Sequence, residues 1–188
     1  MKNNPFSTTQ EQILDAAEAV VIERGVKGMT LETVAAKANL SKGGLLYHFP
    51  SKNNIVQGMV SRIAMIIEKR FIAELANEPI SQGRHARTLL RLMMDTESSL
   101  FPRLQRVAAP LLAAMADNSK MLDPMRQFYQ GVQKGMLDDG LSVDRSWLVL
   151  AALDGLKFWR IFGLLEPAVE DLKKLRLLLT QIIDQEAM

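Results

Sequence analysis

The sequence predicts an all-α fold of about nine helices, with a small N-terminal group of three helices and a larger C-terminal helical part. Apolar residues recur at helical spacing along most of the chain, and capping residues, glycines and prolines mark the expected helix ends. No segment alternates polar and apolar residues as a strand would, and there is no internal repeat. A chain of 188 residues can bury a substantial core.

The first helix is expected from about Thr8 to Arg24, with Gly25 as its stop. Its inward positions repeat at helical spacing; they are Ile13, Ala17, Val20 and Val21.

Two short helices joined by a tight turn follow. Thr30 is a natural N-cap, and Val34, Ala35 and Ala38 form an apolar stripe after it. Asn39 tolerates the left-handed conformation that a sharp exit from a helix requires. Ser41 caps the second helix, which runs to about His48 before Pro50 stops it. This pattern predicts a helix-turn-helix, whose second helix lies in the DNA major groove.

The second helix carries a glycine pair, Gly43 and Gly44, although each glycine costs about 1 kcal/mol relative to alanine inside a helix. Such a pair is tolerable where a bulky object, such as a DNA strand, approaches the backbone closely. Leu45 and Phe49 are spaced to share the inward face. The expected DNA contacts are therefore Thr30, Thr33, Ser41, Lys42, Gly43, Gly44, Tyr47, His48 and Lys52.

Each of these contacts has a simpler alternative. Lys42 and Lys52 can be solvated lysines, but a cation at a helix start opposes the helix dipole unless an anion answers it, which favours phosphate contact. Tyr47, His48 and Thr33 can instead serve packing. Five basic residues and one acid lie between Arg24 and Lys52, and the acids of the first helix almost cancel that charge.

The N-terminal region, from Glu11 through about Met59, resembles the TetR family of transcriptional regulators. The shared motif consists of 13–17 (ILDAA), 24–25 (RG), 29–31 (MTL) and 40–52 (LSKGGLLYHFPSK). The family usually has glycine where this chain has Asn39. The resemblance implies an all-helical homodimer that binds double-stranded DNA through residues 1–50. Residues 51–188 then form a helical domain for effector binding and dimerisation, and a long helix from Ser51 links the two.

The remaining helices are read from apolar stripes and breakers. The linking helix is expected from Ser51 to Asn77, and Pro110 should kink the helix that follows Ser99. The others are expected over about 81–96, from Asp123 or Ser119 to Gly140, beyond Asp144 to about Leu165, and from Pro167 onward.

The last two helices are too apolar for a lone surface pair. Facing their symmetry copies, they would make a four-helix bundle. The alternative, that both apolar faces are filled within one subunit, is less favoured. The expected dimer residues are Trp147, Ala151, Gly155, Phe162, Leu172, Leu175, Leu179 and Ile182.

Methionines and aromatic residues concentrate between residues 93 and 136, which suits a pocket for a small, largely apolar effector but also suits ordinary core filling. Asp154 is either the counter-ion of a cationic ligand or, as we favour, the partner of Lys157 or part of the dimer seam. His85, with Arg84 and Arg87, is expected to form a solvated helix start. The candidate ligand residues are Met93, Phe101, Leu104, Met115, Phe128, Asp154 and Trp159.

Several function classes are disfavoured. The chain has no cysteine and two distant histidines, so thiol chemistry and a histidine metal site are not expected, and no cofactor motif or nucleophile elbow marks an enzyme. No apolar run is long enough for a membrane span, and the polar start of the chain does not suggest export, so a cytoplasmic protein is expected.

Together with these patterns, the resemblance to the TetR family implies a ligand-responsive repressor that binds a quasi-palindromic operator as a homodimer. The alternatives are a transcriptional activator, or a helical module whose N-terminal unit binds protein. A steep, log-linear salt dependence would distinguish DNA binding from protein binding.

Overall fold

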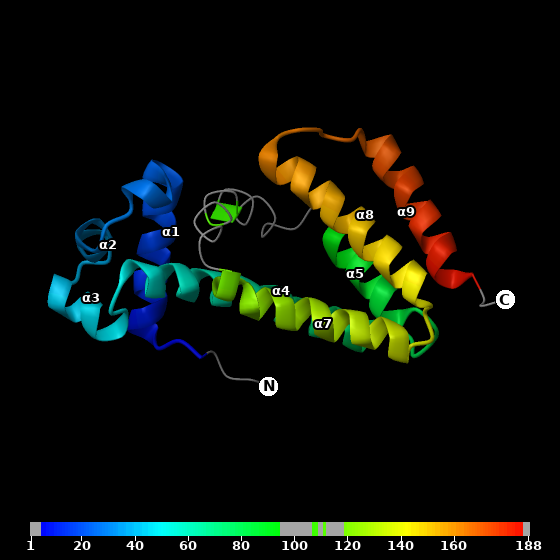
Figure 1. Ribbon diagram of the computed structural model, residues 1–188, viewed down its shortest axis with the longest axis horizontal. Helices are drawn as coiled ribbons and strands as arrows, with labels where there is room; N and C mark the ends of the chain where they lie inside the picture. Colours follow the sequence, from blue (N-terminus) through cyan, green and yellow to red (C-terminus); the bar gives the residue numbers. More distant parts are fainter. Residues whose placement is uncertain (1–4, 95–106, 109–110, 112–118, 186–188) are drawn as a thin grey trace. The chain divides into compact units, whose positions relative to one another are not determined.

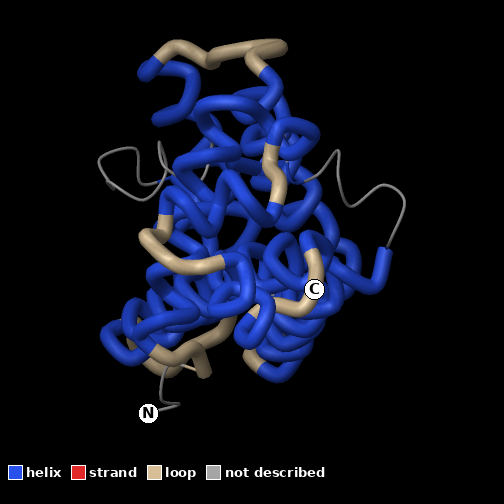
Figure 2. The backbone as a smooth tube through the Cα atoms, turned by 90° about the vertical axis from the view of Figure 1, so that its left-hand side faces the viewer, coloured by secondary structure: helices blue, strands red, loops and turns tan. Residues whose placement is uncertain are grey.

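The computed structural model describes residues 5–94, 107–108, 111 and 119–185. Within these ranges every regular element is a helix and none is a strand, which confirms the predicted all-α class (Figure 2). Most of the helix expected after Ser99 lies outside the described residues. In the part of the chain that is described, no helix is both long and apolar enough to cross a bilayer.

The described residues form two compact units. The first unit takes its residues from 1–63 and 106–124, and the second from 64–105 and 125–188. Helix α4 (Lys52–Asn77) begins in the first unit and ends in the second, and the division between the units falls after Ile63. Helix α7 (Asp123–Asp138) also crosses the boundary, just after Pro124.

The first unit contains α1 (Thr8–Gly28), α2 (Leu31–Lys37), α3 (Lys42–His48) and the start of α4 (Figure 1). Gly25, with φ of 69°, interrupts α1 where the sequence predicts its stop, and one further turn follows to Gly28. The core of this unit is formed by residues that are completely buried; they are Ile13, Leu14, Ala17, Val34, Leu45 and Ile55.

Phe49 is buried beside Leu45, which confirms the predicted inward face of α3. Gly58 of α4 lies close to this core, because a Cβ there would come within 2.9 Å of both Leu14 and Phe49. The absence of a side chain at Gly58 therefore lets α4 pack closely against α1 and the end of α3.

The second unit contains α4 from Ala64 onward and α7 from Met125 onward. Its other helices are α5 (Arg84–Met94), α8 (Val143–Phe162) and α9 (Val169–Asp184). Helix α5 packs against both α8 and α9, and Figure 1 shows it alongside α8. Phe71 of α4 meets Phe128 of α7 edge-on, with ring centroids 5.7 Å apart. Leu89, Met136 and Val149 complete the centre of this core.

The helix starts differ in detail from those expected. Gly83, with φ of 72°, keeps the preceding residues in a turn, so α5 begins at Arg84 and not at Ser81. A 3-10 helix over Ser119–Leu122 leads directly into α7 at Asp123, so both starts considered for this helix are used.

The prediction of a solvated start for α5 is wrong. The backbone N–H of His85 donates to Asp139 Oδ2 at 2.6 Å, and the ring Nδ1 lies 2.6 Å from the same oxygen. The ring packs near Phe71 and against Gly135, where a Cβ would come within 2.3 Å of it. His85 is therefore a packed link between α5 and α7.

Arg84 and Arg87 also form hydrogen bonds and ion pairs within the second unit. Arg84 donates to the backbone carbonyls of Leu75 and Glu78, which satisfies carbonyls near the end of α4. Arg87 forms ion pairs with Glu78 at 2.9 Å and with Asp184 at 2.8 Å. The start of α5 thus holds the ends of α4 and α9 in place.

Candidate nucleic-acid interface and ligand pocket

Capping bonds fix both sides of the turn between α2 and α3. Thr30 Oγ1 accepts from the N–H of Thr33 at 3.1 Å, and Ser41 Oγ accepts from the N–H of Gly44 at 3.0 Å. Asn39 adopts φ of 53° between them. The two predicted caps and the predicted left-handed turn residue are confirmed.

A side chain of α1 supports the same turn. Gln12 Nε2 donates to the carbonyl of Ala38 at 2.7 Å, and the N–H of Leu40 donates to the carbonyl of Ala35 at 2.9 Å. Carbonyls at a helix end have no partner within the helix, and these two bonds give the carbonyls of Ala35 and Ala38 a donor. The direction in which α3 leaves the turn is thereby fixed relative to α1.

The outward side of α3 is open. Tyr47 is 85% exposed, and its ring meets that of His48 edge-on at a centroid distance of 5.1 Å. A Cβ on the exposed Gly43 would meet nothing nearer than Ser41 Oγ, at 4.0 Å. Since no contact within the unit requires glycine here, the bare backbone is available for close approach by an external molecule.

The lysine at the start of α3 has an anionic partner within its own unit. Lys42 Nζ lies 2.6 Å from Glu32 Oε1 of α2, and both side chains are more than half exposed. The hydrogen bond from Lys42 is the main reason why the pKa of Glu32 is lowered. Sequence reasoning did not find this pair. An exposed pair of this kind is weak enough for a phosphate to compete with Glu32 for the ammonium group.

The other expected DNA contacts also lie in the first unit. Thr33 Oγ1 accepts from the N–H of Thr30 and donates to its carbonyl, both at 2.9 Å, so this hydroxyl is engaged in the cap of α2. Lys52 is the first residue of α4, next to Ser51, whose Oγ accepts from the N–H of Asn54.

A buried arginine, which sequence reasoning missed, joins α4 to α1. Arg62 has a 6% exposed side chain, and its guanidinium donates to Glu11 at 3.1 Å, Asp15 at 2.7 Å and Glu18 at 2.8 Å. The three acids are spaced to lie along one side of α1. That spacing, together with an arginine inside the apolar stripe of α4, is the signal that could have revealed this cluster, which we call the Arg62 clamp.

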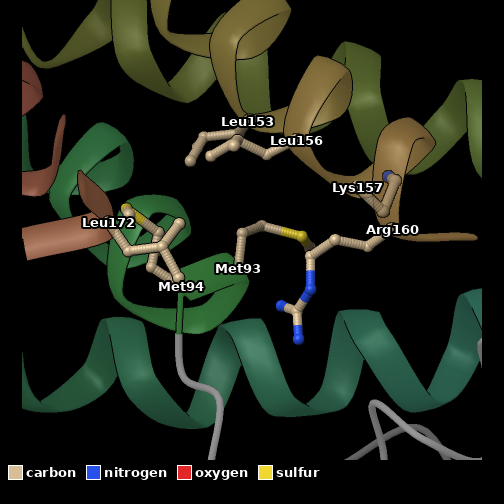
Figure 3. Close-up of a pocket in the computed structure, with 7 residues that line it drawn as sticks. All are labelled: Met93, Met94, Leu153, Leu156, Lys157, Arg160 and Leu172. Carbon is tan, nitrogen blue, oxygen red and sulfur yellow. The ribbon is translucent and has the colours of Figure 1, made fainter. Parts of the chain in front are cut away.

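The second unit contains a small pocket between side chains of α5, α8 and α9 (Figure 3). Its cavity volume of ≈ 20 Å³ suffices for a water molecule and is far below the volume of an occupied ligand site. Its lining is apolar except for two cations; it consists of Met93, Met94, Leu153, Leu156, Lys157, Arg160 and Leu172.

Lys157 belongs to a polar cluster beside this pocket. Its Nζ donates to Asp154 at 2.7 Å and to the Tyr129 hydroxyl at 2.6 Å, and Tyr129 donates to Asp154 at 2.5 Å. Burial raises the pKa of the Tyr129 phenol, which stays neutral. Burial opposes the charge of Lys157, but its contacts with Tyr129 and Asp154 outweigh that effect and raise its pKa. The preferred pairing of Asp154 with Lys157 is present.

The expected ligand residues separate in the structure. Met93 lines the pocket and Asp154 lies behind its lining, bonded to Lys157. Phe128 is 7% exposed and belongs to the core, while Trp159 is 41% exposed and is not part of the lining. The three others, Phe101, Leu104 and Met115, lie outside the described residues.

One side of α8 is apolar and exposed. Trp147 is 59% exposed, and Phe162 and Ala151 are exposed on the same side as the open Gly155, where a Cβ would meet nothing within 4 Å. The expected dimer residues of α8 therefore face away from their own core. We call this surface the α8 outer face; its exposed apolar members are Val143, Trp147, Leu148, Ala151, Phe158, Trp159 and Phe162.

The expected dimer residues of α9 are buried or half-buried within their own subunit. Leu179 is 2% exposed and lies in the core of the second unit, with Leu175 and Ile182 packed against that core. Leu172 lines the pocket. Helix α9 packs against α5 and α8. The exposed apolar residues of α9 are Val169, Leu177 and Leu178.

Comparison with known families gives two matches. Residues 13–59 match the family of bacterial regulatory proteins named tetR, and residues 83–184 match the tetracyclin repressor-like C-terminal domain. The chain is 43% identical over 54 residues to the HTH-type transcriptional repressor BepR of Brucella suis, covering 29% of this chain and 26% of BepR. It is 37% identical over 51 residues to IcaR of Staphylococcus aureus, a negative transcriptional regulator of a biofilm operon, covering 27% of each protein. The chain thus matches only about a quarter of the length of these relatives.

Solved structures with the same fold cover almost the whole chain. The multidrug binding protein EbrR, complexed with malachite green, superposes with a TM-score of 0.71 at 21% identity, over 95% of this chain and all of that one. The fatty acid degradation regulator FadR from Bacillus halodurans gives a TM-score of 0.70 at 15% identity, over 94% and 96%. At these identities the likeness establishes the fold alone.

Proposed function

Because the chain belongs to the TetR family of bacterial regulatory proteins, we propose that it is a ligand-responsive transcriptional repressor that acts on cytoplasmic DNA. The observation that carries this proposal is the open outward side of α3, where Gly43 leaves the backbone bare and Tyr47 is almost fully exposed. Its buried side, at Leu45, anchors the helix in the first unit.

The proposed repressor binds a quasi-palindromic operator as a homodimer. Each subunit places its α3 in the major groove, and the two half-sites lie about one helical turn, or roughly 34 Å, apart. Lys42 and Lys52 bind phosphates, while Tyr47 and His48 reach the DNA from the far end of α3. The remaining proposed DNA contacts lie at the capped starts of α2 and α3; they are Thr30, Thr33, Ser41, Gly43 and Gly44.

The homodimer forms through the α8 outer face. A face with two tryptophans and two phenylalanines exposed is costly in water and typical of a protein interface. Ala151 and Gly155 are small, so a second helix can approach this face closely. Leu177 and Leu178 of α9 extend the apolar surface that a partner would cover.

An effector in the second unit releases the operator. Helices α4 and α7 both belong to the two units, and α4 follows α3 directly in the chain, so α4 is the element through which a change around the pocket would reach α3. The effector favours a conformer in which the two α3 helices are wrongly spaced, and it shifts the balance only by its difference in affinity for the two conformers.

Selection of bound fragments from random duplex DNA tests the proposal and reports the half-site spacing. With the selected operator, the logarithm of the binding constant should fall linearly with the logarithm of salt concentration. Lys42→Ala should weaken binding to a similar degree on all duplexes and lower the salt slope by about 1. Lys134→Ala, which removes an exposed lysine of the second unit, is the matched control and should change neither.

Failure to bind any duplex at low ionic strength would refute DNA binding. A loss confined to the selected operator in Lys42→Ala would show that Lys42 reads bases. Activation of the adjacent gene, instead of its repression, would favour the activator alternative.

A further inference from the structure

The pocket of the second unit has an uneven distribution of charge. Methionine and leucine side chains form most of its wall, and its two ionised lining residues, Lys157 and Arg160, are both cations. They are three residues apart on α8, so they lie on the same side of that helix. The carboxylates that pair with them, Asp154 and Glu166, are not part of the lining.

Both cations remain charged in this setting. An arginine guanidinium is protonated at any physiological pH. The raised pKa of Lys157 keeps its ammonium group charged as well. An ammonium group has three N–H donors, and its bonds to Asp154 and Tyr129 use two of them. The pocket therefore presents the N–H donors of two cations, and no carboxylate, beside an apolar wall.

We propose that the effector is an amphipathic organic anion, with a carboxylate head bound by Lys157 and Arg160 and a slender alkyl body among the methionines and leucines. This inference rests on the proposed function, since it names the class of ligand that releases the operator. A lipophilic cation would meet two cations and no carboxylate on the lining, so its charge would be buried there without a partner, which is unfavourable.

The size of the pocket restricts the shape of the ligand. A cavity of ≈ 20 Å³ must enlarge before it can hold an alkyl chain. Met93 and Met94 form one side of it, and methionine side chains change conformation readily because they are unbranched. A narrow, flexible body fits a site that opens by moving these two side chains better than a broad ring system does.

Three probes, each built on an unbranched ten-carbon chain, test the charge requirement: decanoate, decanol and decyltrimethylammonium, each used below its micelle concentration. Isothermal titration calorimetry with the full-length protein should show that decanoate binds at least about tenfold more tightly than either of the others. Decanoate alone should release the protein from its selected operator. Equal or tighter binding of decanol or the cation, or binding of none of the three, would overturn the inference.

Two variants locate the site. Arg160→Gln, and the charge-balanced double variant Asp154→Asn with Lys157→Met, should each weaken decanoate binding about tenfold or more while changing decanol binding less than about twofold. Lys134→Gln removes an exposed lysine of α7 and serves as the control, with decanoate affinity unchanged. Undiminished decanoate binding in both pocket variants would overturn the assignment of the head-group site.

The effector inference and the proposed function fail in distinguishable ways. Calorimetry of decanoate needs no DNA, and operator binding is measured without any probe. A protein that binds its operator but prefers the cation contradicts only the effector class. A protein that binds decanoate but no duplex contradicts the proposed repressor.

Discussion

Arg62 shows how one buried side chain can decide the geometry of a whole unit. Its guanidinium is almost completely buried and bonds to three carboxylates of α1. A buried charge is tolerated only when it is paired and hydrogen-bonded, and removal of one partner leaves the others uncompensated. The Arg62 clamp therefore fixes α1, whose Gln12 in turn supports the turn before α3.

Arg62→Met should lower the free energy of unfolding by about 3 kcal/mol or more, because three carboxylates lose their cation at once. Asp15→Asn should cost less than about 1 kcal/mol, since Asp15 has a 63% exposed side chain. Urea denaturation measures both. Lys69→Met, on the exposed side of α4, is the control. If it lowered the free energy of unfolding as much as Arg62→Met does, the effect would come from general changes in α4 and not from the Arg62 clamp.

At the scale of the element, α3 is less stable than an alanine-containing helix would be, but its backbone is open to close approach by DNA. It is a seven-residue helix with two glycines, and one of them, Gly43, has no neighbour that a Cβ would disturb. Glycine lowers helix stability because it loses more backbone freedom on folding than alanine does. Nothing inside the unit compensates this cost, so its benefit lies outside the unit, in the proposed DNA contact.

Gly43→Ala should raise the free energy of unfolding by about 1 kcal/mol and weaken operator binding about tenfold, equivalent to roughly 1.4 kcal/mol. Gly131→Ala is the matched control, because Gly131 is an exposed helical glycine of α7 with nothing within 4 Å of a Cβ. It should give a similar gain in stability with unchanged operator affinity. Undiminished binding by Gly43→Ala would contradict close approach of DNA at this backbone.

At the scale of the whole molecule, α8 is apolar on both sides. One side is buried against α5, with Val149 and Leu153 at its centre, and the opposite side is the exposed α8 outer face. A helix that is hydrophobic all round is normally buried. The exposed side is therefore the surface that the proposed homodimer would cover.

Trp147→Glu should convert the proposed dimer to a monomer and abolish high-affinity operator binding, because an uncompensated carboxylate in an apolar interface is strongly unfavourable. Sedimentation equilibrium measures the change in mass. Ile80→Glu is the control: Ile80 is 91% exposed in the loop after α4, and the same replacement there should leave the mass unchanged. A Trp147→Glu protein of unaltered mass would place the subunit interface elsewhere.

The sequence predicted best those features that depend on neighbouring residues. The caps at Thr30 and Ser41 and the left-handed Asn39 follow from local chemistry, and so does the pairing of Asp154 with Lys157 one turn away. The Arg62 clamp was missed because its acids lie 44 to 51 residues away in the chain.

Periodicity also could not tell which surface covers a stripe. The stripe through Leu172 and Leu179 is predicted to meet a partner subunit, and the structure shows that its own subunit already buries Leu179 and half-buries Leu172. Similarly, the charged start of α5 suggested solvent, whereas His85 is enclosed by Asp139, Phe71 and the bare backbone of Gly135. Both cases concern contacts between distant segments, which the spacing of residues within one segment does not encode.

The chain contains only two indole rings, and both belong to the α8 outer face. Tryptophan emission from the native protein therefore originates from this single surface and not from the DNA-contacting helices. Since indole emission shifts to the blue when water leaves its surroundings, the proposed association of subunits through this face would have its own optical signal and need no attached dye. Tryptophan emission does not report directly on binding at α3, because the exposed aromatic ring there is that of Tyr47.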